Sequence, residues 1–92
     1  LDQATAIVRA RVPMASADLV TGVAEAVQRL RGLDVQKPPG IAEAIDWVQA
    51  AALLGLVSLD ESGVERTLSS VLKYREDQEL ARAEGLAWVA GQ

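Results

Sequence analysis

From Leu19 to Leu30, apolar residues recur every three or four positions, and an α-helix is the structure that gathers such residues on one side. Ser16 precedes this stretch as a candidate N-cap, and Gly32 follows it as a candidate helix stop. The pattern therefore predicts an amphipathic helix over residues 17–31, with one buried and one solvated face. The predicted buried face consists of Leu19, Val20, Val23, Ala26, Val27 and Leu30.

The same periodicity predicts helices on both sides of this one. A first helix over about residues 2–11 stops before Pro13, because the residue that precedes a proline is disfavoured in the helical conformation. Two consecutive prolines in Leu33–Gly40 (LDVQKPPG) predict a polyproline-like loop. Further helical patterns cover residues 41–55, residues 61–74 with Asp60 as N-cap, and residues 75–90. The patterns leave open whether the last two form separate helices or one long bent helix.

Composition favours an all-α fold. Half of the 92 residues are hydrophobic, yet the chain has only two Trp, one Tyr and no Phe. The apolar residues are mostly Ala, Leu and Val, and Ala and Leu head the helix-propensity ranking while β-formers are scarce. Residues 41–55 are apolar over most of the helix circumference, which is typical of a central helix. We expect one domain over residues 1–92, a small bundle of four to five helices with Trp47 and Trp88 in the core or an interface.

Several function classes are excluded by missing residue types. The chain has no His and no Cys, which removes the commonest general base and every imidazole or thiolate metal ligand. Thirteen acidic and nine basic residues give a net charge of −4, the wrong sign for a protein that mainly neutralises nucleic-acid phosphates. We therefore expect no thiol enzyme, no metal site and no nucleic-acid partner.

The expected location of the protein follows from sequence features that it lacks. The longest apolar stretch is too short and too interrupted to cross a bilayer, so we expect no membrane association. The chain begins with Leu1 and carries no signal-peptide pattern, and we expect it to be a piece of a longer protein. The lack of cysteine fits a reducing compartment, and a cytoplasmic location is expected.

The turn that follows the prolines holds the candidate site residues. Lys37 and the first amides after Gly40 could bind an anion, since a glycine turn that leads into a helix offers free N–H groups, although Glu43 would oppose a phosphate. Glu43 and Asp46 lie three residues apart on one helix face, as a pair of acid–base or metal-binding carboxylates would. The simpler interpretation of this pair is that acidic residues favour helix N-termini.

Three stretches occur in order along the chain: Ile7–Pro13 (IVRARVP), Leu33–Trp47 (LDVQKPPGIAEAIDW) and Thr67–Tyr74 (TLSSVLKY). Together they resemble the C-terminal helical lid of MoxR-type AAA+ ATPases, and the resemblance covers about Asp2 to Gln78. The middle stretch is the most specific, because Lys-Pro-Pro-Gly followed by an Ala-Glu-x-x-Asp-Trp helix is an uncommon combination.

The resemblance implies a lid-like fold that follows an α/β domain, packs over bound ATP and moves as ATP is hydrolysed. It implies ATP and magnesium in the parent protein, no cofactor and no catalysis in this chain alone, and a chaperone-like role in the maturation of other proteins. The implied partners are its own upstream ATPase domain, neighbouring subunits of a ring and a von Willebrand factor A domain protein.

The same resemblance points to Lys37, Gly40 and Glu43 as a turn that faces the nucleotide. Many AAA+ lids place an arginine, called sensor 2, at the start of the third lid helix, and Glu43 stands at about that position here. Lys37 is the nearest cation in the sequence that could replace this arginine.

Two other functions remain open from the sequence. One is a stand-alone helical module that binds a partner protein through an exposed apolar face. Candidates for that face are Trp88, Val89 and the run Leu53, Leu54 and Leu56. The other is an independent acid–base enzyme that uses Glu43 and Asp46.

Overall fold

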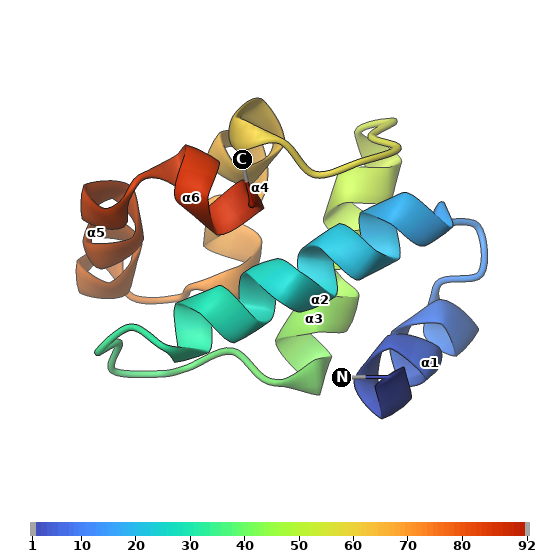
Figure 1. Ribbon diagram of the computed structural model, residues 1–92, viewed down its shortest axis with the longest axis horizontal. Coiled ribbons are helices and arrows are strands. Elements are labelled where there is room, and N and C mark those ends of the chain that lie inside the picture. The colour runs from blue at the N-terminus through green and yellow to red at the C-terminus, as the bar shows by residue number, and fades with distance from the viewer. Residues whose placement is uncertain (1, 92) are drawn as a thin grey trace.

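A computed structural model describes the backbone of residues 2–91. Within this range the chain is all-α, about 70% helical, with six helices and no strand, which confirms the predicted fold class. The helices are α1 (Asp2–Arg11), α2 (Ala17–Arg31), α3 (Ile41–Leu53), α4 (Glu61–Val71), α5 (Arg75–Glu84) and α6 (Leu86–Ala90) (Figure 1).

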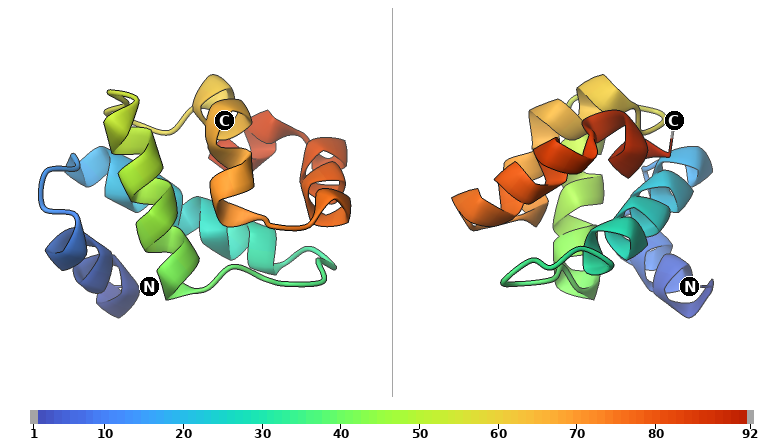
Figure 2. Two further views of the ribbon diagram at one scale, coloured as in Figure 1. Left: turned by 180° about the vertical axis from the view of Figure 1, so that it is seen from behind. Right: turned by 60° about the vertical axis from the view of Figure 1, so that its left-hand side comes forward.

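Helix α3 lies at the centre of the bundle. It contacts α1, α2 and α4, and α2 crosses it in Figure 1. Helix α6 packs against α2 and α4, while α5 lies at the edge and packs against α6 (Figure 2). The Cα atoms extend over 32 × 23 × 20 Å. Within residues 2–91, none of the helices has the length and apolar character that a membrane crossing requires.

The core forms where the helical stripes meet. All six residues of the predicted α2 stripe are buried. Trp47 of α3 is completely buried, and its indole N–H donates to Thr67 Oγ1 of α4 at 2.6 Å. The Thr67 hydroxyl in turn donates to the Gly63 carbonyl oxygen at 2.6 Å. The largest side chain of the core is thus hydrogen-bonded within the core, and this bond joins α3 to α4.

Both predicted N-caps are confirmed. The Asp60 carboxylate accepts the Gly63 N–H at 2.7 Å at the start of α4. The Ser16 hydroxyl accepts the Leu19 N–H at 3.1 Å at the start of α2, and it donates to the Val57 carbonyl oxygen at 2.5 Å. Ser16 therefore begins a helix and also ties the α1–α2 turn to the α3–α4 loop.

Replacing Ser16 by alanine is expected to lower the free energy of unfolding by about 1–2 kcal/mol, because it removes a cap and a tertiary hydrogen bond. The measurement is urea unfolding followed by circular dichroism. Ser16→Asp is the control, since a carboxylate caps α2 but cannot donate to Val57. An alanine variant as stable as wild type would contradict the double role of Ser16.

The C-terminal half departs from the predicted boundaries. Residues 61–90 form three helices, since an extended residue at Leu72 ends α4 and Gly85 separates α5 from α6. The interpretation of residues 75–90 as one helical stretch is therefore wrong. Gly85 has φ +109°, a backbone conformation that L side chains rarely adopt, and it redirects the chain there. The third helix also ends at Leu53, two residues before the predicted Gly55.

Candidate functional site

The loop Leu33–Gly40 carries Lys37 and leads into α3, and hydrogen bonds from two side chains hold it. The first contact is made by Asp77 of α5, whose side chain is fully buried. Its Oδ1 accepts the Gln36 N–H at 2.8 Å and its Oδ2 accepts the Lys37 N–H at 3.1 Å. One carboxylate thus fixes two consecutive backbone amides of a loop that lies about 40 residues away in the sequence.

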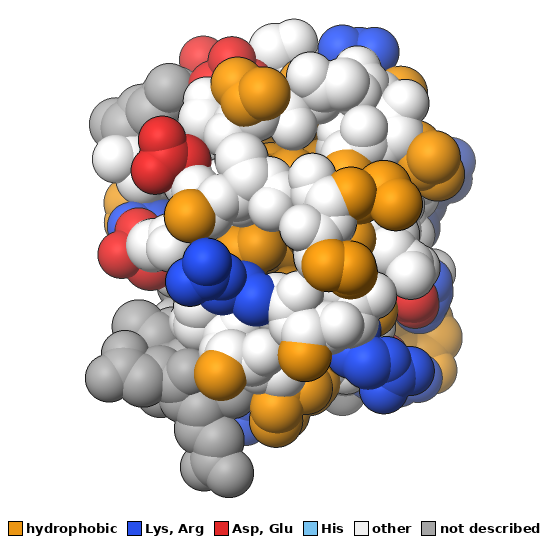
Figure 3. Space-filling view, turned by 90° about the vertical axis from the view of Figure 1, so that its right-hand side faces the viewer, with side chains coloured by type: hydrophobic (Ala, Val, Ile, Leu, Met, Phe, Trp, Pro, Cys, Tyr) orange, Lys and Arg blue, Asp and Glu red, His pale blue; other side chains and the backbone are white. Residues whose placement is uncertain are grey.

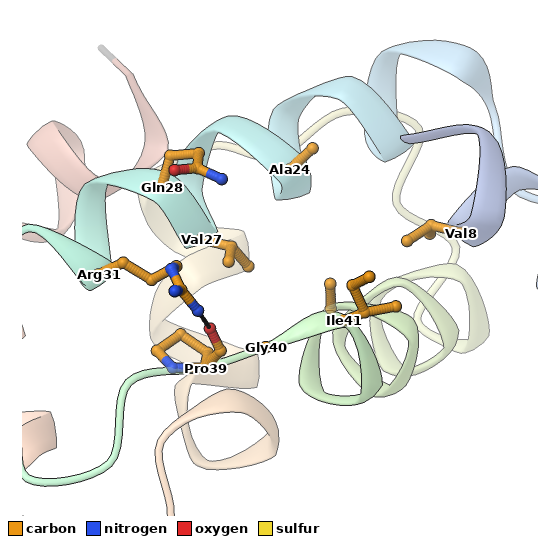
Figure 4. A pocket seen from close by; sticks show the side chains of 9 residues that line it. Val8, Ala24, Val27, Gln28, Arg31, Pro39, Gly40 and Ile41 are labelled. Carbon is orange, nitrogen blue, oxygen red and sulfur yellow. Dashed lines mark hydrogen bonds between the residues drawn. The ribbon is translucent and has the colours of Figure 1, made fainter. Parts of the chain in front are cut away.

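The second contact comes from the last turn of α2. Arg31 donates from Nη1 to the Pro39 carbonyl oxygen at 2.9 Å, and the Pro39 ring is buried (Figure 4). Because Pro39 immediately precedes Gly40, this bond fixes the direction in which the chain enters α3. The loop is therefore held at both ends of its Lys-Pro-Pro-Gly segment.

The structure brings Lys37, Gly40 and Glu43 together. Glu43 Oε1 accepts the Gly40 N–H at 2.8 Å, so the side chain caps its own helix. This bond is the largest cause that lowers the pKa of the Glu43 carboxyl below its ordinary value. Partial burial opposes the shift, and the charges of Lys37 and Lys73 lower the pKa further. The Glu43 carboxylate thus carries its negative charge at a helix start where two lysine charges also favour it.

This capping role bears on the acid–base hypothesis. Asp46 is exposed to solvent, whereas the Glu43 carboxylate is engaged with Gly40. Within the part of the chain that the structure describes, no group of three or more His, Cys, Asp or Glu residues could hold a metal ion. The arrangement therefore supports the simpler interpretation, in which Glu43 stabilises a helix start.

The turn also bears on a bound phosphate. Glu43 already accepts the first N–H of the turn and adds negative charge there. The charges of Lys37 and Lys73 act on Glu43 in the opposite sense, and Arg31 lines the hollow beside Gly40. The engaged N–H and the Glu43 charge both oppose a direct phosphate cradle at this turn.

A hollow of about 300 Å³ opens beside this turn, between α1, α2 and the start of α3 (Figure 4). Its walls are mostly apolar, and Gln28 and Arg31 supply the polar side chains. The lining residues are Val8, Ala24, Val27, Gln28, Arg31, Pro39, Gly40, Ile41 and Ala44. Of the predicted site residues only Gly40 belongs to this lining, and Lys37 and Glu43 lie outside it.

Two residues of this site were missed by the sequence analysis, namely Arg31 and Asp77. Arg31 looks like one of several arginines on amphipathic helices, and Asp77 stands in the polar first half of the 75–90 pattern. No local pattern marks either residue, because their partners are backbone groups of a distant loop. Arg31, rather than Lys37, is the cation that lines the hollow beside Gly40.

A second surface feature lies at the opposite end of α3. Large apolar side chains are exposed there, and Figure 3 shows hydrophobic side chains spread over this face of the molecule. Met14 is 81% exposed, Leu53 85% and Val57 70%. A hollow of about 290 Å³ lies there, lined by Met14, Ala15, Ser16, Ala52, Gly55, Leu56 and Val57. We call Met14, Leu53, Leu54 and Val57 the apolar face.

The predicted exposed residues are thus partly correct. Leu53, Leu54 and Trp88 are exposed, and Leu56 is half-buried against the core. Val89 is fully buried, so its prediction as an exposed residue is wrong. The turn at Gly85 directs α6 across α2 and α4, and the Arg29 guanidinium donates to the Val89 carbonyl oxygen at 3.1 Å.

Replacing Glu43 by glutamine tests whether the charge of the Glu43 carboxylate stabilises the fold, because that contribution depends on pH. Folding lowers the pKa of Glu43 below its ordinary value of 4.5, so the ionised carboxylate stabilises the fold above this pH. This contribution disappears as the pH falls through the lower pKa of the folded chain. At pH 7 the free energy of unfolding of wild type is expected to exceed that of E43Q by about 0.5–1 kcal/mol. The difference should shrink between about pH 5 and pH 3.

Urea unfolding at several pH values measures this difference. Glu25→Gln, an exposed position on α2, is the control for the change in net charge. A stability gap between wild type and E43Q that does not change with pH would show that the charge of Glu43 contributes nothing.

Comparisons with protein-family models, with curated proteins and with solved structures found no match for this chain.

Proposed function

We propose that this chain is the C-terminal lid of a MoxR-type AAA+ ATPase, packed beside ATP that an upstream α/β domain binds. The observation that carries the proposal is the rigid turn from Lys37 to Glu43. Hydrogen bonds from Arg31 of α2 and Asp77 of α5 fix its backbone, while the Lys37 side chain is exposed. A lid that responds to a nucleotide needs such a turn, because charged groups must be presented at a defined position.

The packing also supports a part that moves as one body. Helix α3 is enclosed by α1, α2 and α4, and polar contacts tie the outer helices to the rest. Arg29 joins α2 to α6, and Asp77 joins α5 to the loop before α3. A domain with these connections can rotate on a hinge without changing its own core.

The proposed division of work follows from the residue types. The upstream domain supplies the nucleotide and magnesium site, and this chain supplies positive charge beside it. Two cations flank Gly40: Arg31 in the hollow and Lys37 on the loop. Ring formation and the maturation of a client protein belong to the same proposal, with neighbouring subunits and a von Willebrand factor A domain protein as partners and the cytoplasm as the location.

The natural polypeptide provides the test. We expect a P-loop, Gly-x-x-x-x-Gly-Lys-Ser/Thr, within roughly 200 residues before Leu1, since that is the size of one further domain. In that polypeptide Lys37→Ala should weaken ATP binding or turnover, while Lys37→Arg retains both. Arg31→Lys keeps the positive charge but changes the geometry of the hydrogen bond to Pro39. This variant therefore shows whether ATP turnover depends on the charge of Arg31 or on that hydrogen bond.

The outcomes are distinct. Absence of a P-loop, or ATP binding and turnover unchanged in Lys37→Ala, would overturn the proposal. Glu25→Gln is the matched control, because it is exposed on the solvent side of α2.

The apolar face favours a second candidate, a helical module that binds a partner protein without nucleotide. Side chains as large and as exposed as Met14 and Leu53 are unusual on a surface with no partner. For this candidate the natural polypeptide should not bind ATP. Met14→Ser with Leu53→Ser should abolish partner binding without lowering the melting temperature, since neither side chain is in the core.

A further inference from the structure

We propose that Asp77 is a positioning residue that couples helix α5 to the Lys37–Glu43 turn, so that the place of α5 determines where Lys37 stands. The coupling itself follows from the geometry of this chain. Its consequence for a nucleotide rests on the proposed function.

The attachment of α5 to the rest of the molecule is unusually polar. Of the ten residues of α5 only Asp77 and Ala81 are buried, and they share one face because they lie four positions apart. Ala81 contributes little apolar area, so the two hydrogen bonds of Asp77 are a large part of what holds the helix. The ion pair of Arg82 with Glu65 is exposed, and such pairs contribute little.

The loop depends on the same carboxylate. Its residues Gln36 and Lys37 are exposed, and the bonds to Asp77 are what fixes their backbone. A charged acceptor that binds two consecutive N–H groups defines the orientation of both peptide planes. The Lys37 side chain is thereby free to reach solvent from a fixed base, at a place where its charge acts on Glu43.

Removing the charge from Asp77 should therefore move Lys37, whereas removing a nearby charge should not. Asp77→Asn keeps the size of the side chain but replaces one acceptor oxygen with an NH₂ group. That group is a donor and cannot accept the backbone N–H that it faces. Glu79→Gln is the matched control, since it makes the same chemical change on an exposed position of the same helix.

The first experiment uses the 92-residue chain and needs no ligand. In wild type the Gln36 and Lys37 amides should exchange with solvent at least about tenfold more slowly than the neighbouring exposed amide of Asp34. In D77N that protection should be lost, while the amides of α2 remain protected and E79Q behaves as wild type. Exchange of Gln36 and Lys37 as fast as that of Asp34 in wild type would overturn the proposal, and this outcome can be measured even if D77N does not fold.

A second readout in the same chain follows Lys37 through its neighbour. Nuclear magnetic resonance titration of the Glu43 carboxyl should give a higher pKa in Lys37→Ala than in wild type, because the lysine charge lowers it. Asp77→Asn should shift the pKa in the same direction, whereas a purely structural role elsewhere would leave it unchanged. A Glu43 pKa that rises in K37A and not in D77N would overturn the proposal.

The natural ATPase provides the functional arm. D77N and K37A should raise the KM for ATP by similar factors, and the double variant should be no worse than K37A alone, because both changes remove the same contact. Additive effects would show that Asp77 does not act through Lys37. If the natural polypeptide lacks ATP turnover, the proposed function fails, while the exchange and titration experiments still decide the coupling.

Discussion

Trp47→Ala is expected to lower the free energy of unfolding by about 3–5 kcal/mol, the largest effect of any single change in this chain. Trp47 is completely buried on the central helix, and its removal leaves a cavity where α3 meets α4. The substitution also removes the indole N–H, whose hydrogen bond the Thr67 hydroxyl accepts. Because a domain of this size is stable by only about 5–15 kcal/mol, the variant should melt tens of degrees lower.

Thermal unfolding followed by circular dichroism measures this effect. Trp88→Ala is the matched control, since the same residue type stands 40% exposed on α6, and it should cost only about 1–2 kcal/mol. Trp47→Phe retains most of the ring volume but not the N–H, and we expect an intermediate loss. Equal losses for W47A and W88A would contradict the assignment of Trp47 as the centre of the core.

The second large effect is expected from Asp77→Ala. This change leaves the Gln36 and Lys37 N–H groups without their charged acceptor, and bonds to charged groups are worth more than neutral ones. We expect the free energy of unfolding to fall by about 2–4 kcal/mol. The loop should also become sensitive to proteases at Gln36 and Lys37, because both residues are exposed and their N–H groups lose the acceptor that holds them.

Urea unfolding and limited proteolysis measure the two consequences. Glu79→Ala on the same helix should change stability by less than about 0.5 kcal/mol, because it is exposed. If D77A and E79A were equally stable, Asp77 would be an ordinary surface carboxylate and the buried geometry would carry no energy.

The helical fold follows from local patterns for a clear reason. The stripe from Leu19 to Leu30, the N-caps at Ser16 and Asp60 and the proline breaks each act within a few residues. A helix boundary is set by such neighbours, so α1 and α2 have the predicted bounds. The prediction fails after Arg75, because Gly85 has a positive φ that a periodic pattern does not reveal.

The break at Gly85 also changes which residues are buried. A single helix over residues 75–90 would have used Leu80 and Ala83 as its apolar face. In the two-helix arrangement both of these are exposed, while Asp77 and Val89 are fully buried. A buried aspartate is the opposite of what hydropathy favours, and it is stable because backbone N–H groups of the loop satisfy it.

The candidate site also consists of residues that the sequence places together and residues that only the fold brings there. Lys37, Gly40 and Glu43 lie within seven residues, and their sequence alone places a lysine, a glycine turn and a capping glutamate at one helix start. Arg31 and Asp77 belong to the site only because the bundle returns α2 and α5 to the loop.

The sequence by itself thus determined an acidic, all-helical chain without histidine or cysteine and the local chemistry of its proline–glycine turn. The tertiary structure alone decided which distant side chains hold that turn and which cation lines the hollow beside it. Helix periodicity and capping depend on neighbours in the chain, whereas a buried carboxylate that binds a loop 40 residues away depends on the packing of the whole bundle.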